Sequence, residues 1–424
     1  MAVFRKNPNQ VFTPRGEAVT EMYVSRPDLE NALMNSLNQP KNIVIHGESG
    51  SGKSWLYKSV FKKNMVRFDP VNLGKAVAYG SISKLFTGEI SRFSEDALIE
   101  RSVTSSAEAN VVLANGGVAT ERVYVPREKD SLEQLFAAIR KGVPQSRKCV
   151  LVLDNLEQIL DFPDLVRELA SILILVDDHQ YARHDVKILL VGTANIIHTF
   201  HSSVPNSITI RNRLVELPEV ARLVPASAER FVRKGLFEAL DCKVVTRSNF
   251  NEKILVDSVL WYTDRIPQYL HELCLDVANL AIASGRDISI DTFQKAAINW
   301  VRSALVAELA VVDANLNINR NKVGRRNQVV YALGRCGEEE IDANRIERIV
   351  RKEFPESCNG VGLNISQTLS QLSESDHPLL RKLPFGNGYR FVDPRLRIVI
   401  RWKLQREFGS EKLRLRDFGD AIEL

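Results

Sequence analysis

The stretch that decides the fold is Asn42-Ile43-Val44-Ile45-His46, followed at once by Gly47-Glu48-Ser49-Gly50-Ser51-Gly52-Lys53-Ser54. The first five residues form a short apolar run ending in a glycine-rich loop, which is typical of a buried parallel strand. The next eight fit the pattern G-x-x-x-x-G-K-[ST] at every fixed position, and residues 54–63 are predicted to continue as a helix. This order of strand, loop and helix predicts a phosphate-binding loop in a parallel α/β protein.

The chemistry of the loop predicts a site for a nucleoside triphosphate, most simply ATP with Mg²⁺. Backbone N–H groups of residues 48–53 would donate to phosphate oxygens, helped by the N-terminus of the following helix. Lys53 would reach the β- and γ-phosphates, and the hydroxyl of Ser54 would bind Mg²⁺. Trp55, directly after the loop, and Arg26, upstream of the strand, complete the predicted nucleotide-binding set.

A second oxygen ligand is needed to hold the metal. Asp154 follows the fully apolar run Cys149-Val150-Leu151-Val152-Leu153, which reads as another buried strand. Ligands of open α/β sheets bind at the carboxyl ends of the strands, so Asp154 is the predicted Mg²⁺ partner of Ser54.

Hydrolysis also needs a group that polarises the attacking water. The residue after Asp154 is Asn155 rather than glutamate, which leaves Glu157 as the favoured base and Glu48 as another nearby carboxylate. A third strand, from Lys187, ends in small polar residues, of which Thr193 or Asn195 could hydrogen-bond the γ-phosphate or the water. Asn195 is the favoured one. The missing glutamate points to slow hydrolysis, and therefore to a switch rather than a motor.

The pattern of elements predicts an α/β fold with a parallel five-stranded sheet and helices on both faces, followed by a helical lid and a winged helix. At 424 residues, two to four domains are expected. Strands alternate with helices at first, and from about Ser227 helices alone come next. Three short helices, a hairpin and a basic terminal helix from Asp393 to Arg406 follow. The predicted parts are an N-terminal extended arm (1–25), the nucleotide-binding domain (26–225), the lid (226–312) and the winged helix (313–424). Within the nucleotide-binding domain, residues 73–130 are predicted to be irregular except for a β-hairpin insertion near 105–125.

Composition excludes several classes of protein. The five cysteines form no C-x-x-C pair, which argues against a zinc ribbon and against a disulfide framework. Neither a signal peptide nor an apolar run long enough for a membrane span is visible, so we expect a cytoplasmic protein without a membrane partner. Residues 320–424 carry 20 Lys or Arg against 15 Asp or Glu, and so hold the whole net charge of +5. A surface that attracts anions is therefore expected in the C-terminal part.

Taken in order, these motifs resemble those of AAA+ ATPases. The loop 47–54, the strand and carboxylate 149–154, the run Gly192-Thr193-Ala194-Asn195 and an arginine pair precede the helical lid and the winged helix. The likeness is greatest to the initiator branch, which includes the origin-recognition ATPases, and to related STAND and transposon-regulator ATPases. Tyr23-Val24-Ser25-Arg26-Pro27-Asp28-Leu29 is similar to the segment that precedes the loop in such proteins.

The resemblance implies further roles. Asn195 would be the sensor-1 residue, and Arg213, or else Arg211, would be an arginine finger that reaches the γ-phosphate of a neighbouring subunit. A finger that acts on a neighbour implies a homo-oligomer. The chain departs from the family at the sensor-2 position, where Gln268 replaces the arginine and Arg265 replaces a glycine, so the resemblance does not extend to that coupling of the lid to the nucleotide.

The sequence leaves the partner open. The third helix of the winged helix, residues 364–373, contains no Lys or Arg, so contacts to DNA phosphates would have to come from residues flanking it. These are Arg381, Lys382, Arg390, Arg395, Arg397, Arg401 and Lys403. Winged helices also serve as protein-docking or autoinhibitory modules. The predicted function is an oligomerising ATP-dependent switch acting on duplex DNA or protein; the alternatives are a sensor ATPase of a bacterial antiviral defence system with a separate effector chain, and a helicase-loader or chaperone-like ATPase.

Overall fold

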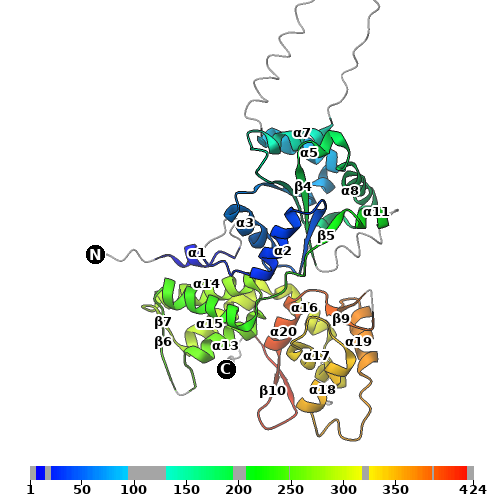
Figure 1. The fold of residues 1–424 in the computed structure, drawn as a ribbon. Coiled ribbons are helices and arrows are strands. Elements are labelled where there is room, and N and C mark those ends of the chain that lie inside the picture. Colours follow the sequence, from blue (N-terminus) through cyan, green and yellow to red (C-terminus); the bar gives the residue numbers. More distant parts are fainter. Residues whose placement is uncertain are drawn as a thin grey trace, which may run out of the picture. The chain divides into compact units, whose positions relative to one another are not determined.

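The computed structural model describes residues 6–14, 21–93, 130–193, 207–247, 249–317, 324–383 and 386–417 (Figure 1). The predicted hairpin near 105–125 and Asn195 lie outside these ranges. The chain divides into two compact units. The sheet unit comprises Ser25–Gly47 and Lys53–Val220, and the C-terminal unit comprises Met1–Val24, Glu48–Gly52 and Ala221–Leu424. The middle of the glycine-rich loop thus groups with the C-terminal unit.

A parallel sheet forms the centre of the sheet unit. Its strands are β1 (Asn42–His46), β2 (Arg67–Asn72), β3 (Cys149–Asp154), β4 (Val186–Gly192) and β5 (Leu214–Glu216). Their order is β2-β3-β4-β1-β5, and every neighbouring pair is parallel, which confirms the predicted five-stranded parallel sheet. Since β1 and β3 both flank β4 and run parallel to it, the carboxyl ends of these three strands lie at the same edge of the sheet.

Helices cover both faces of the sheet, which explains why its central strands are apolar throughout. Successive residues of a strand face opposite sides: Val44 packs into one core, and Ile43 and Ile45 pack into the other. The helices α2 (Pro27–Leu37) and α3 (Lys53–Lys63) contribute to the second core. The first core is closed by α5 (Ile82–Phe93), α7 (Ser131–Arg140) and α8 (Pro163–Leu175) (Figure 1).

The prediction of irregular chain from residue 73 is wrong for its first part. The structure has α4 (Gly74–Tyr79) there, and then α5. Glu168 of α8 caps the start of α5, accepting hydrogen bonds from the backbone N–H groups of Ile82 and Ser83 at 2.7 and 2.8 Å. A carboxylate 85 residues away thus satisfies donors that a local capping residue normally satisfies, and no sequence pattern shows this.

The C-terminal unit contains the lid helices. They are α12 (Pro225–Arg233), which continues into the π-helical turn η2 (Lys234–Ala239), then α13 (Glu252–Thr263), α14 (Pro267–Ala283), α15 (Ile290–Ala304) and α16 (Val306–Asn315). Two strands of two residues each, β6 (Lys243–Val244) and β7 (Asp287–Ile288), pair between these helices. We expected helices alone between residue 227 and the winged helix. That expectation is wrong, because β6 and β7 form a small two-stranded sheet there.

The winged helix has the predicted order. It consists of α17 (Arg325–Arg335), α18 (Ala343–Glu353), α19 (Ile365–Glu374), β8 (Leu380–Lys382) and β9 (Tyr389–Phe391). The last two pair antiparallel and form the wing. The final helix α20 (Arg395–Lys403) is shorter than the predicted one, because the chain turns back in a second hairpin of β10 (Leu404–Arg406) and β11 (Leu413–Leu415). Gly409 in its turn has a φ of +69°, which favours glycine.

One buried carboxylate joins the lid to the winged helix. Asp264 lies at the end of α13, and its oxygens are 2.5 Å from Arg222, 2.7 Å from Arg397 and 2.9 Å from Arg401. Burial opposes the charge, but the three guanidinium groups hold the pKa of Asp264 well below its usual range. Since Arg397 and Arg401 belong to α20, the cluster fixes α20 against α13.

The N-terminal segment packs on the lid, and α1 (Pro8–Val11) makes it partly helical rather than extended throughout. Phe12 is fully buried, and a Cβ at Gly235 of η2 would lie 2.3 Å from its ring. The backbone N–H of Thr13 donates to Nδ1 of the buried His271 at 3.0 Å, which requires that nitrogen to be unprotonated.

His271 should make the stability of the protein depend on pH. Burial lowers its pKa to about 4, whereas the unfolded chain has a value of about 6.5. Between these pH values the unfolded state binds more protons than the folded state. The contribution of neutral His271 to the free energy of unfolding is therefore complete above pH 6.5, and it falls by roughly 3 kcal/mol as the pH drops toward 4. Urea unfolding at a series of pH values should show a shallower decline for His271→Gln than for wild type. The same change at the exposed His377 is the control, and parallel curves for wild type and His271→Gln would contradict the prediction.

Candidate nucleotide-binding site

The predicted metal ligands lie together in the sheet unit. Ser54 is at the start of α3, Asp154 ends β3, and Ser54 Oγ is 3.4 Å from Asp154 Oδ2. Both are oxygen donors of the kind that Mg²⁺ prefers, a hydroxyl and a carboxylate. The donor set therefore fits the predicted ion.

Lys53 is held at the beginning of the same loop. Its Nζ donates a hydrogen bond to the carbonyl oxygen of Gly47 at 2.9 Å. The ammonium thus stays close to the loop backbone rather than extending into solvent. A phosphate oxygen would offer it a stronger, charged acceptor than this carbonyl.

The middle of the loop, Glu48–Gly52, makes its contacts within the C-terminal unit. Gly50 and Gly52 have φ values of +76° and +95°, which only glycine adopts without strain. The carbonyl oxygen of Gly50 accepts from the backbone N–H of Gln268 at 3.2 Å, and a Cβ on Gly50 would lie 3.0 Å from that of Gln268. The residue at the sensor-2 position therefore contacts the loop through its backbone and the base of its side chain.

Tyr57 belongs to this site, although its sequence position gives no sign of it. The side chain is fully buried on α3, and its hydroxyl hydrogen-bonds with Ser54 and Asp154. Burial and the charge of Asp154 raise the pKa of Tyr57 well above its usual value, so the phenol stays protonated and can donate. On an amphipathic helix such a tyrosine reads as part of the core, and it packs as one against Phe61 and Phe68.

Comparison with known proteins identifies the sheet unit. Residues 37–200 match the family model described as AAA domain. These residues form an AAA domain. The predicted resemblance to AAA+ P-loop ATPases is therefore confirmed for residues 37–200, which contain the phosphate-binding loop, β3 and β4.

Solved structures match over most of the chain. A Walker-type ATPase of Pyrococcus abyssi has 14% identity and a TM-score of 0.51, covering 92% of this chain and 99% of that one. Cdc6p of Pyrobaculum aerophilum (16% identity, TM-score 0.43) and the Orc1 protein of Aeropyrum pernix in complex with DNA (12%, 0.43) each cover 92% of this chain and 96% and 95% of theirs. At such identities the first likeness shows a shared fold, and the lower TM-scores add nothing to it. A comparison with curated protein sequences gives no match.

The candidate base of the AAA domain lies just after β3. Glu157 is on a single 3₁₀ turn, Leu156–Ile159, and its Oε2 is buried with no hydrogen-bond partner among the described residues. Asn155 adopts a left-handed conformation with φ +61°, and its backbone N–H donates to Asp154. Asn155 thus shapes the turn after β3 through its backbone conformation and its backbone N–H. Both Glu157 as the base and Asn195 as sensor 1 stay predictions.

The arginine pair lies before the edge strand β5. Arg213 forms an ion pair with Asp177 at 2.6 Å and donates to the carbonyl of Thr209 at 3.1 Å, whereas Arg211 is exposed at the end of α11 (Ser207–Arg211). An arginine finger at 213 would have to exchange Asp177 for a neighbour's phosphate.

The remaining two members of the predicted nucleotide set lie at the starts of helices. Arg26 is the N-cap residue of α2, and its backbone N–H donates to Glu30. Trp55 is half-buried in the first turn of α3. Their contact with a nucleotide stays a prediction.

The cations expected to bind DNA phosphates are engaged within the C-terminal unit. Arg397 and Arg401 pair with Asp264, and Arg390 pairs with Glu340 at 3.3 Å. These three side chains are 3, 4 and 9% exposed, so the prediction that they supply phosphate contacts is wrong. The other four also have acidic partners: Arg381 with Glu48, Lys382 with Glu374, Arg395 with Asp393 and Glu308, and Lys403 with Asp313.

Among the residues in the described ranges, no group of three or more His, Cys, Asp or Glu side chains is arranged to hold a metal. None of the helices in the described part of the chain is long and apolar enough to cross a membrane.

Replacing Tyr57 by phenylalanine should weaken the dependence of nucleotide binding on Mg²⁺. The hydroxyl orients the two metal ligands, and loss of such outer hydrogen bonds typically costs about 10–100-fold in metal affinity. Titration of Mg²⁺ against a fluorescent ATP analogue should show a half-saturation point at least about tenfold higher for Tyr57→Phe, with binding in EDTA unchanged. The exposed Tyr79 supplies the matched Tyr79→Phe control. An unaltered Mg²⁺ curve would show that the tyrosine only fills the core.

Proposed function

We propose that this chain is a cytoplasmic ATP-binding AAA+ switch that hydrolyses ATP slowly, oligomerises and controls a partner. The observation that carries the proposal is the arrangement of Lys53, Ser54 and Asp154 at the carboxyl edge of the parallel sheet of an AAA domain. We assign residues 26–225 to the nucleotide-binding domain, 226–312 to the lid and 313–424 to the winged helix, with 1–25 as an N-terminal arm.

Slow turnover follows from the residues after β3. The side-chain amide of Asn155 cannot accept a proton from water, and Asp154 is assigned to the metal. The first carboxylate after Asn155 in sequence is Glu157. The unpartnered Oε2 of Glu157 supports it as the base, because a buried carboxylate oxygen without a donor is costly unless it serves a ligand or water. A finger from a second copy, Arg213 or Arg211, would complete the site and make hydrolysis depend on assembly.

The charges of the winged helix favour a protein as the partner over duplex DNA. All seven flanking cations have acidic partners within the chain, and α19 contains no Lys or Arg. Binding to a phosphate backbone would require breaking these pairs, whereas docking of a protein would not. A separate effector chain, as in a sensor ATPase of a defence system, and a client of a loader or chaperone both satisfy this condition.

Two variants separate nucleotide binding from hydrolysis. Lys53→Ala should abolish binding of a fluorescent ATP analogue, because the loop loses its only lysine and the charge that meets the phosphates. Glu157→Gln should retain binding but lower phosphate release by about 100-fold or more, the usual contribution of a positioned base. Glu238→Gln, at an exposed glutamate of η2 outside the site, is the matched carboxylate control for hydrolysis. Turnover of Glu157→Gln equal to wild type removes Glu157 as the base, and ATP binding by Lys53→Ala refutes the site itself.

A salt titration tests the choice of partner. In 50 mM salt with ATP present, we expect at most weak binding to duplex DNA, measured by fluorescence anisotropy, and little change when Lys382 and Arg395 are both replaced by glutamine. Tight binding to DNA whose affinity falls steeply with salt would contradict the proposal of a protein partner. In that case the slope of log affinity against log salt concentration should become shallower by about one unit for each cation removed.

A further inference from the structure

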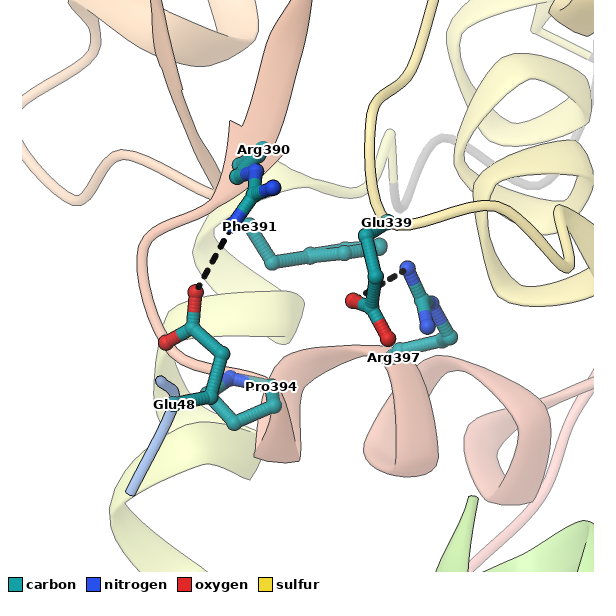
Figure 2. A pocket seen from close by; sticks show the side chains of 6 residues that line it. All are labelled: Glu48, Glu339, Arg390, Phe391, Pro394 and Arg397. Atoms are coloured by element: carbon teal, nitrogen blue, oxygen red, sulfur yellow. Dashed lines mark ion pairs between the residues drawn. The ribbon is translucent and has the colours of Figure 1, made fainter. Parts of the chain in front are cut away.

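The second residue of the phosphate-binding loop is held by the wing. Glu48 Oε1 is 3.0 Å from Nη2 of Arg381 on β8. The same oxygen is 3.9 Å from Nη1 of Arg390 on β9 (Figure 2). All three residues belong to the C-terminal unit. The two paired strands of the wing thus each direct one guanidinium group at the same carboxylate.

This contact is partly removed from water. The side chain of Arg390 is 9% exposed and that of Glu48 is 19% exposed. They line a small pocket together with Glu339, Phe391, Pro394 and Arg397 (Figure 2). A charged pair so placed interacts more strongly than an exposed one, and separating it leaves charges that need new partners.

A second contact holds the loop two residues further on. The carbonyl oxygen of Gly50 accepts from the backbone N–H of Gln268, and a Cβ at Gly50 would lie 3.3 Å from the side chain of Ile266. In this state the loop is therefore fixed by the lid at Gly50 and by the wing at Glu48.

We propose that the pairing of Glu48 with Arg381 and Arg390 is a latch that nucleotide phosphates open, releasing the wing. This inference rests on the proposed function, since it concerns the regulation of the same loop. A triphosphate adds several negative charges to a loop that already carries Glu48, and two arginines cannot neutralise both. The phosphates thereby weaken the hold of the wing on the loop.

Thermodynamic linkage predicts the direction in which opening the latch changes nucleotide affinity. If phosphate binding opens the latch, then opening the latch by mutation must raise nucleotide affinity by the same factor. Arg381→Gln removes the closer guanidinium, which lies outside the loop. We expect it to tighten ATP binding by about fivefold or more, the lower range of measured couplings. Its neighbour Lys382 pairs with Glu374 instead, so Lys382→Gln is the matched control and should leave the affinity unchanged.

The sign also excludes the nearest alternative. Were Arg381 a direct ligand of the nucleotide, Arg381→Gln would weaken binding. In a double-mutant cycle, Glu48→Gln and Arg381→Gln should be non-additive, because either change alone opens the latch. Weaker binding by Arg381→Gln, or additive effects in the cycle, overturns the proposal.

Hydrogen exchange separates failure of the latch from failure of ATP binding. Without nucleotide, the amides of β8 and β9 should exchange faster in Arg381→Gln than in wild type or Lys382→Gln. Adding ATP should raise this exchange in wild type but not in Lys53→Ala. Unchanged exchange in nucleotide-free Arg381→Gln overturns the latch alone. Equal binding of ATP by wild type and Lys53→Ala overturns the proposed function, and the nucleotide-free comparison still judges the contact.

Discussion

The buried carboxylate of Asp264 is the constraint on which the C-terminal unit depends. It meets three guanidinium groups, two of them less than 5% exposed, and without it they would be buried cations with too few partners. Breaking such a cluster from one side typically costs about 3–5 kcal/mol. Because α20 follows β9 after only three residues, anchoring α20 to the lid also sets where the wing can lie. The position of Arg390 beside Glu48 is thus a consequence of the cluster.

The same unit pairs many of its basic side chains with acidic ones. Three consecutive glutamates after α17 pair with arginines from three separate segments: Glu338 with Arg345, Glu339 with Arg222, and Glu340 with Arg390. A DNA-binding winged helix derives much of its affinity from cations that are free to displace counterions. Here these cations hold parts of the unit together, which supports a winged helix that regulates the loop.

The sequence was sufficient for features that local patterns encode. The loop, the apolar strands and the order of helices in the winged helix follow from spacing alone, and Asp154 could be placed because it ends an apolar run. It failed where distant residues decide the outcome. The start of α5 depends on Glu168, the three-residue β5 is too short to show a period, and Tyr57 resembles any core aromatic. Net charge misled because it does not show which cations are already paired.

The two contacts on the loop differ in what they can sense. The lid reaches Gly50 through the uncharged backbone N–H of Gln268, and the sensor-2 arginine that would carry charge there is absent. A neutral hydrogen bond changes little in strength when phosphates bind nearby. The contact at Glu48 is ionic, and its strength changes directly with added negative charge. If the loop reports its occupancy within this chain, the wing arginines are therefore better placed to respond than the lid glutamine.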